Sequence, residues 1–178
     1  LSGNSNKLTI LCNENGYYAK YLSDRYGFNN LDSMWDEEKI DYTIIGDSFG
    51  IGECVNRDEN IASNFILNKK KVLNLSYSGH GPLKQFAVLK EYWKIDSDYI
   101  IWLFYEGNDM RDFNIEKVNS ILKKYIDDEK FSQNLIRKQT IIDDYYNEEY
   151  IKNLSINKIK YPIEIRIINF LKLFETRN

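Results

Sequence analysis

A run of β-branched and aromatic residues that stops abruptly constrains the fold of this chain more than any other feature. The run extends from Tyr42 to Ile45, and Gly46-Asp47-Ser48 follows it directly. The run favours a buried strand, whereas glycine, aspartate and serine favour a turn. In an open α/β sheet, ligands bind outside the carboxyl ends of the strands. The sequence therefore places Ser48 where a nucleophile could act.

Strand-like and helix-like patterns alternate after Asp41, which is typical of βαβ units and a parallel sheet. Strands are predicted at 42–45, 71–75 and 99–105, and helices at 58–67 and from Pro82 onward. The last strand, Tyr99 to Tyr105, is apolar on both faces, as a central strand covered by helices on each side would be. The fold class that this pattern indicates is α/β.

Each predicted strand ends in a polar or glycine-rich loop. Ser48 follows the first strand, Gly79 the second and Asn108 the third. Parallel strands bring these three loops to one edge of the sheet. Asp47 and Asp109 are predicted to brace these loops by hydrogen bonds rather than to do chemistry.

Each loop taken alone also fits a structural role. Gly-Asp-Ser is a common turn, and Asn108-Asp109 is a common helix cap. Their joint occurrence after three successive strands favours a site. Gly-x-Ser-x-Gly from Gly46 to Gly50 also fits the nucleophile elbow of α/β-hydrolases, but that fold needs more sheet before the serine.

These three blocks, in this order, resemble those of the SGNH, or GDSL, hydrolase family of esterases and acyl hydrolases. The resemblance covers 41–112 and implies a flavodoxin-like three-layer α/β/α sandwich with a parallel sheet, and no metal or organic cofactor. It implies that Ser48 is the nucleophile and that the backbone N–H groups of Ser48 and Gly79 and the side-chain amide of Asn108 form an oxyanion hole. Each such donor contributes about 3 kcal/mol to an acyl-transfer transition state. It implies a small-molecule or carbohydrate ester as substrate, with O-acyl groups on envelope carbohydrate as the class that the family favours. The stretch from Leu8 to Trp35 is similar to the lead-in of a bacterial branch of undefined substrate. That branch implies a cell-envelope or periplasmic location, and a cytoplasmic one stays open.

A serine nucleophile needs a base, and the residues that would supply one are missing. The family carries its base in a fourth block, Asp-x-x-His, near the carboxyl terminus, whereas the one histidine of this chain, His80, follows Gly79. His80 is expected to contact substrate or solvent rather than to act as the base. The chain is then a fragment that ends before the fourth block, which we favour, or a complete protein without hydrolytic competence. A non-catalytic module that binds acylated carbohydrate and an O-acyltransferase are the alternatives to an esterase.

Composition bounds the remaining questions. The 178 residues, 43% hydrophobic, predict one domain: a lead-in of strand and loops at 1–40, an α/β core at 41–112 and a helical part at 113–178. Within the helical part, helices are predicted near 115–122 and 142–151, and Pro162 interrupts a later apolar stretch. The net charge of −3 argues against a nucleic-acid partner. No apolar run approaches the roughly 20 residues of a membrane span. The oligomeric state stays open.

The two cysteines, Cys12 and Cys54, leave two interpretations open. They are too few for a disulfide scaffold, and with His80 they lack the spacing of a zinc site. Two free buried thiols are the simpler interpretation. A Cys12–Cys54 bridge would imply an oxidising compartment, and it suits the location that the family resemblance implies.

Overall fold

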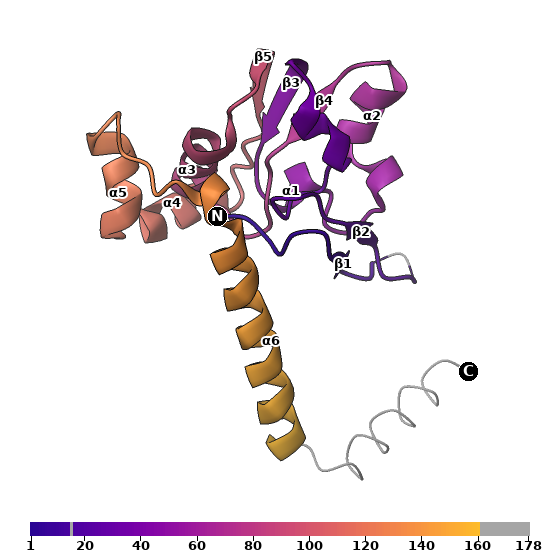
Figure 1. Cartoon of the computed structure of the whole chain (residues 1–178), viewed down its shortest axis with the longest axis vertical. Coiled ribbons are helices and arrows are strands. Elements are labelled where there is room, and N and C mark those ends of the chain that lie inside the picture. Colours follow the sequence, from indigo (N-terminus) through magenta and orange to yellow (C-terminus); the bar gives the residue numbers. More distant parts are fainter. Residues whose placement is uncertain (15, 161–178) are drawn as a thin grey trace. The chain divides into compact units, whose positions relative to one another are not determined.

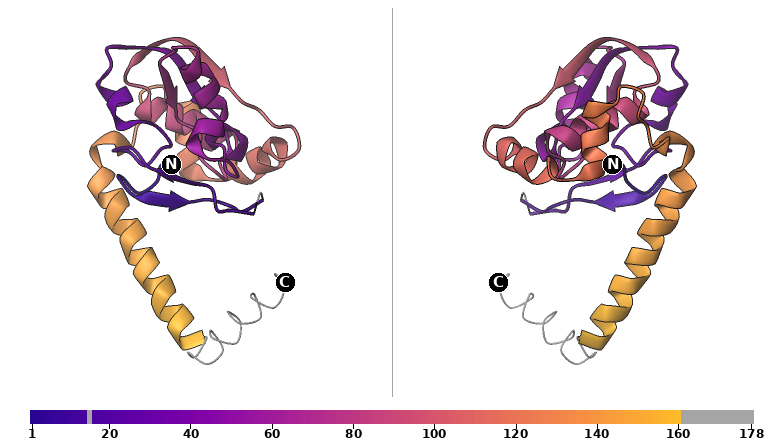
Figure 2. Two further views of the ribbon diagram at one scale, coloured as in Figure 1. Left: turned by 90° about the vertical axis from the view of Figure 1, so that its right-hand side faces the viewer. Right: turned by 90° about the vertical axis from the view of Figure 1, so that its left-hand side faces the viewer.

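The computed structural model describes residues 1–14 and 16–160. The chain divides into two compact units, Leu1–Ile142 and Asp143–Asn178. The first unit holds two separate sheets, a two-stranded one near the amino terminus and a three-stranded one (Figures 1 and 2). All the candidate active-site residues that the sequence predicts belong to this unit.

The three-stranded sheet is parallel and has the order β4-β3-β5. Its strands are β3 (Lys39–Ile45), β4 (Val72–Asn74) and β5 (Asp96–Trp102). The chain goes from the middle strand to one edge and then returns past the middle to the other edge. Such a reversal, here between β3 and β5, is the topological switch point at which open α/β sheets bind ligands.

Helices cover both faces of this sheet, which confirms the α/β class and the parallel sheet. On one face, Val88 and Tyr92 of α3 (Pro82–Tyr92) pack in the same buried cluster as Ile45 and Leu73. On the other face, Ala62 of α2 (Ile61–Leu67) packs with Ile44 and Val72 of the strands. Buried apolar side chains therefore hold the sheet between α2 and α3 (Figure 1).

The amino end of α3 is held by a side chain from another helix. Pro82 occupies the first turn, as predicted, because a helix needs no N–H there. The buried carboxylate of Glu116 accepts hydrogen bonds from the backbone N–H groups of Gly81 (2.8 Å), Leu83 (3.0 Å) and Lys84 (3.2 Å). A negative charge stabilises the positive end of a helix dipole. Glu116 thereby fixes the loop that carries Gly79 and His80.

The lead-in is more ordered than the sequence predicts. The strand expected near residue 8 is β1 (Leu8–Ile10), and it pairs antiparallel with β2 (Lys20–Leu22), which the sequence does not reveal. A 3₁₀ turn, η1, spans Asp32–Asp36. Between them the polar stretch 24–30 is largely buried, with Phe28 fully inside the main core.

The prediction of a central strand at Tyr99–Tyr105 is wrong. Strand β5 begins and ends three residues earlier, at Asp96 and Trp102, and it lies at an edge of the described sheet. Tyr99, Ile100 and Trp102 are 63%, 39% and 47% exposed. The polar start of β5 pairs with β3 because backbone hydrogen bonds do not require apolar side chains at a solvent-facing edge.

The helix predictions hold in outline and fail at their boundaries. The helix expected at 58–67 is a 3₁₀ turn, η2 (Arg57–Glu59), followed by α2, because the Asn60 side chain accepts the Ser63 N–H and starts a new helix. The helix expected near 115–122 is two helices, α4 (Asp109–Glu116) and α5 (Ser120–Asp127), since Asn119 caps the second. Ile115 and Val118, whose helical spacing predicts a shared apolar face, are exposed.

The remaining elements complete the described chain. α1 (Ser48–Ile51) follows β3, and a 3₁₀ turn, η3 (Leu135–Arg137), precedes α6 (Gln139–Lys160). The predicted helix at 142–151 is confirmed as part of α6. The stretch around Pro162 lies outside the described residues. Within residues 1–14 and 16–160, no helix combines the length and the apolarity that a membrane crossing needs.

Candidate active site

Ser48 begins α1, a helix of a single turn. Asp47 caps this turn, since its Oδ1 accepts the Phe49 N–H at 3.0 Å, and Gly52 ends it with a left-handed backbone (φ +75°). Gly50 has no room for a side chain, because a Cβ there would lie 2.2 Å from the Ser76 Oγ. The turn therefore packs directly on the loop after β4, and Ser48 itself is half-buried.

Asn108 lies beside Asp47. Its Nδ2 donates to Asp47 Oδ2 at 3.2 Å and to Asp112 Oδ2 at 3.1 Å. Both amide hydrogens thus point to carboxylates, and the Asn108 Oδ1 is buried without a partner among the described residues. An exchange of the amide O and N would place oxygen against two carboxylates, so the nitrogen belongs here. The structure brings Asn108 to the residue next to Ser48.

Gly79 lies in the loop after β4, which bonds to the loop after β3. The Tyr77 N–H donates to the Gly46 carbonyl at 3.2 Å. Gly79 has a φ of +73° and is exposed. Among the residues that the structure describes, the N–H groups of Ser48 and Gly79 donate no hydrogen bond. Two of the three predicted oxyanion donors are therefore uncommitted.

Asp109 is fully buried and holds the loop after β5. Its Oδ2 accepts the Tyr105 N–H at 2.7 Å, and its Oδ1 accepts Gln85 Nε2 at 3.3 Å. Gln85 also accepts the Trp102 indole N–H at 2.5 Å and donates to the His80 carbonyl at 2.8 Å. Burial raises the pKa of Asp109, and the nearby Asp47 carboxylate acts in the same direction. These bonds connect the loops after β4 and β5 through α3.

His80 points into the protein rather than into solvent. It is 6% exposed, its ring lies 5.1 Å from that of Tyr77, and its Nδ1 has no partner within the described part of the chain. Burial lowers the pKa of His80 to about 3, so the ring is neutral at physiological pH. The ring therefore has little contact with solvent, and the alternative that His80 contacts substrate stays a prediction. No described hydrogen bond joins His80 to Ser48.

A pocket of about 460 Å³ borders Ser48. Apolar residues of its wall include Phe49, Val55 and Ile61. Three carboxylates line it as well: those of Glu14, Glu53 and Glu59. Glu53 accepts the Ser78 hydroxyl at 2.8 Å, and Glu59 accepts the Tyr17 hydroxyl at 3.0 Å and the Asn56 N–H at 2.9 Å. Gly79 and Asn108 do not line this pocket.

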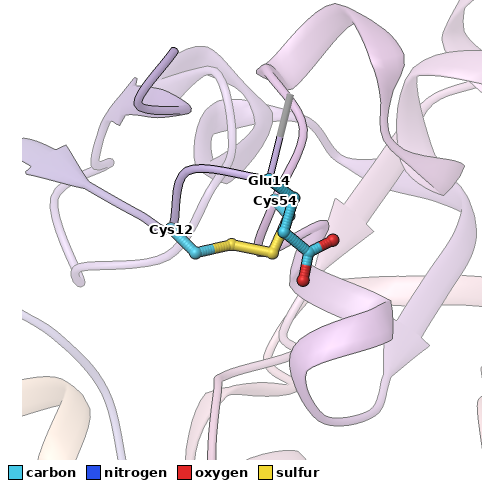
Figure 3. A group of neighbouring side chains, drawn as sticks. All are labelled: Cys12, Glu14 and Cys54. Atoms are coloured by element: carbon cyan, nitrogen blue, oxygen red, sulfur yellow. A yellow bond between two sulfur atoms is a disulfide. The ribbon is translucent and has the colours of Figure 1, made fainter. Parts of the chain in front are cut away.

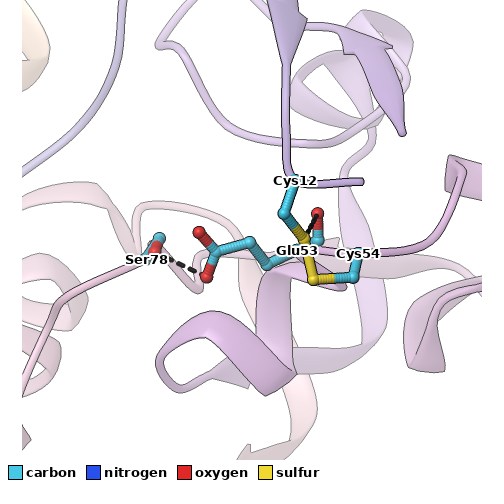
Figure 4. The surroundings of a disulfide bond; sticks show 4 residues. All are labelled: Cys12, Glu53, Cys54 and Ser78. Atoms are coloured by element: carbon cyan, nitrogen blue, oxygen red, sulfur yellow. Dashed lines mark hydrogen bonds between the residues drawn. A yellow bond between two sulfur atoms is a disulfide. The ribbon is translucent and has the colours of Figure 1, made fainter. Parts of the chain in front are cut away.

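A disulfide joins Cys12 to Cys54 (Figure 3), and Cys54 lines the pocket. The interpretation of two free thiols is therefore wrong. Glu14 lies close to both sulfurs, but disulfide sulfurs are not the thiolates that bind metals. Figure 4 shows Glu53 between the disulfide and Ser78. The bridge thus ties the lead-in to the segment that follows α1.

Comparisons of the chain with family models, curated proteins and solved structures found no match. The resemblance to SGNH hydrolases stays an expectation that rests on the three blocks.

Sequence reasoning missed several residues that shape the site. Asp112, four residues after Asn108, follows from helical spacing alone, since positions i and i+4 are neighbours on a helix. Asn29 and Asn74 also bond to the turn of Ser48, and Asn30 bonds to Asn74. No local pattern marks these bonds, because each joins residues at least 22 positions apart.

Proposed function

We propose that this chain carries the nucleophile and oxyanion hole of an SGNH-type serine esterase on a flavodoxin-like three-layer fold. The observation that carries the proposal is the arrangement of the loops after β3, β4 and β5. They meet at one edge of a parallel sheet, and Asn108 there bonds to Asp47, the neighbour of Ser48. The strand order agrees with the first three strands of a flavodoxin-like sheet.

In the proposed reaction, Ser48 Oγ attacks the ester carbonyl carbon and loses its proton to a base. The tetrahedral intermediate collapses, the bond to the alcohol oxygen breaks, and the base returns the proton to that oxygen. Water then attacks the acyl-serine by the same steps, which releases the acid and regenerates Ser48. Uncommitted N–H groups at Ser48 and Gly79 suit the developing oxyanion. Asn108 would join them by exchanging its bond to Asp112 for one to the oxyanion.

In the described part of the chain, no hydrogen bond joins the Ser48 hydroxyl to a base. His80 is buried, and its low pKa makes it a weak proton acceptor. The proposal therefore places the base outside the described residues, as the resemblance to SGNH hydrolases implies.

The pocket beside Ser48 suggests which esters fit. Three carboxylates in its wall would repel an anionic group, whereas a hydroxylated or cationic group could form hydrogen bonds with them. A neutral or cationic carbohydrate ester is thus favoured over an anionic one. The disulfide favours an oxidising compartment such as the cell envelope.

A fluorophosphonate probe tests the proposal, since it labels only an activated serine. We expect the complete gene product to label and Ser48→Ala to remain unlabelled. Ser78→Ala serves as the matched control, because Ser78 lies near the pocket but bonds to Glu53. A complete gene product that folds and never labels would overturn the proposal.

A non-catalytic module that binds acylated carbohydrate is the second candidate. The lack of a described base for Ser48 favours it. Titration of the unlabelled protein with acetylated and deacetylated oligosaccharide distinguishes the two. Tight binding of the acetylated form without release of acetate would support the binding module.

A further inference from the structure

The single-turn helix α1 cannot hold its own shape, and this makes its surroundings important. Forming the first turn of a helix fixes several residues for one hydrogen bond, so isolated turns are unstable in water. α1 comprises only Ser48–Ile51. The position of the Ser48 hydroxyl must therefore come from contacts outside the turn.

Two buried asparagines donate hydrogen bonds to the carbonyl groups at the end of this turn. Asn74 Nδ2 donates to the Gly50 carbonyl at 2.8 Å, and Asn29 Nδ2 donates to the Ile51 carbonyl at 3.1 Å. Asn74 is 1% exposed and Asn29 is 4% exposed. The last carbonyls of a helix have no partner within it, so these amides satisfy groups that the turn leaves open.

Asn74 also reaches the loop that carries Gly79. Its Oδ1 accepts the Ser76 N–H at 3.0 Å. One side chain therefore joins the turn after β3 to the loop after β4. Its two ends fix the relative position of the two loops that hold Ser48 and Gly79.

Asn74 is itself held from the lead-in. The Asn30 side chain accepts the Asn74 N–H at 2.8 Å and donates to the Asn74 carbonyl at 3.0 Å, as a neighbouring strand would. Asn30 in turn donates to Asp24 Oδ2 at 2.9 Å. Asp24 also accepts the N–H groups of Tyr26 and Phe28 and the indole N–H of Trp35. A continuous buried chain of hydrogen bonds thus leads from Asp24 to α1.

We propose that Asn74 and Asn29 are positioning residues that set the place of Ser48 relative to the Gly79 N–H. The proposal rests on the function proposed above, because positioning matters only if Ser48 reacts. In this proposal, neither Asn74 nor Asn29 contacts the substrate. The stretch that reads as a polar lead-in becomes part of the active-site support.

Asn74→Asp is the sharpest test, because it keeps the acceptor for Ser76 and removes the donor to Gly50. The protonated form of the introduced carboxyl can donate again. The labelling rate of Ser48 in the variant is expressed as a ratio to the wild-type rate at the same pH. We expect this ratio to be about one tenth at pH 8. The ratio should rise towards one as the pH falls and the buried acid takes up a proton. A variant that is merely less stable could also recover on acidification, because the buried charge itself lowers stability. The free energy of unfolding of Asn74→Asp is therefore measured at each pH, and the ratio is compared only where both proteins are fully folded.

Hydrogen exchange gives a readout that needs no catalysis. The N–H groups of Gly52 and Glu53 both bond to the Ser48 carbonyl. In Asn74→Asp at pH 8 we expect these two amides to exchange about tenfold faster than in the wild type, as the loss of one hydrogen bond predicts. Asn64→Asp is the matched control, because Asn64 also donates to a backbone carbonyl, that of Asn60, but on α2.

Asn29→Asp is a second test of the positioning role, in case Asn74→Asp does not fold. The introduced charge would face Arg57, whose Nε already donates to Asn29 Oδ1 at 2.9 Å. We expect faster exchange at Gly52 and Glu53 here as well. Unchanged exchange in a folded variant of either position would overturn the positioning role. A wild type that never labels would overturn the esterase proposal alone, and the exchange result would separate the two failures.

Discussion

The strands β3 and β5 lie side by side and deliver Ser48 and Asn108 to one edge, but they are held in different ways. In β3, Ile40, Ile44 and Ile45 are fully buried, and the turn that follows is held by buried amides. β5 exposes much of its apolar surface. Ser48 therefore follows the interior strand of the sheet, and the Asn108 side depends mainly on the buried Asp109.

The turn of Ser48 and the Asn108 side chain differ in how firmly they are held. Asn29 and Asn74 bond to the turn of Ser48, Asp47 caps it, and the disulfide holds the segment that follows it. Asn108 bonds to two carboxylates and must give up one of them to serve an oxyanion. Four predictions test this contrast, in order of decreasing expected effect.

The largest effect is expected from pH, acting on the loop after β4. Between pH 6.5 and about 3, the unfolded chain binds a proton at His80 that the folded chain does not bind. As the pH is lowered from 6.5 to about 3, the free energy of unfolding should therefore decrease by roughly 4 to 5 kcal/mol in total. Above pH 6.5, His80 should contribute no pH dependence to the free energy of unfolding.

Urea unfolding of the wild type and His80→Gln at several pH values measures this term. The difference between the two proteins should grow as the pH falls from 7 to 4. Parallel pH curves would show that His80 is solvated in the folded state, and the loop after β4 would then be less ordered than the turn of Ser48.

Matched truncations compare the two strands directly. Ile44→Ala in β3 should lower the free energy of unfolding by about 3 kcal/mol, because it leaves a cavity in a filled core. Ile100→Ala in β5 should cost about 1 kcal/mol or less, since that side chain is 39% exposed. Equal costs, measured by urea unfolding, would mean that another element covers β5 in solution.

Asp24→Asn tests the support beneath the turn of Ser48. Each carboxylate oxygen of Asp24 accepts two donors, so an amide nitrogen at either place would face two N–H groups. We expect a loss of about 2 kcal/mol in the free energy of unfolding. Asp36→Asn, at an exposed ion pair with Arg25, should cost less than about 1 kcal/mol. Similar losses for the two variants would contradict a special role of the buried chain.

The smallest change in stability is expected on the β5 side. Asp112→Ala releases one amide hydrogen of Asn108, and the lost bond is partly solvent-exposed, so the free energy of unfolding should change by less than about 1 kcal/mol. If that hydrogen is the one the oxyanion uses, fluorophosphonate labelling of Ser48 should become faster. Slower labelling with unchanged stability would instead make Asp112 a support for Asn108.

The sequence predicts the site loops better than the strands that carry them. The turn after Ile45 and the helix start at Pro82 follow from local residue preferences, and both are found. The boundaries of β5 do not follow, because hydrogen bonding across the sheet decides where a strand begins. The break between α4 and α5 depends on the Asn119 cap, whose strength local patterns do not give.

The α/β class, the parallel sheet and the order of the three loops follow from the sequence, because residue periodicity and turn chemistry act locally. The bond between Cys12 and Cys54, the burial of His80 and the bonds from Asn29 and Asn74 to the turn of Ser48 depend on the tertiary structure. Each of these joins segments far apart in the chain. Such contacts form only when the core has brought the segments together, so no local pattern encodes them.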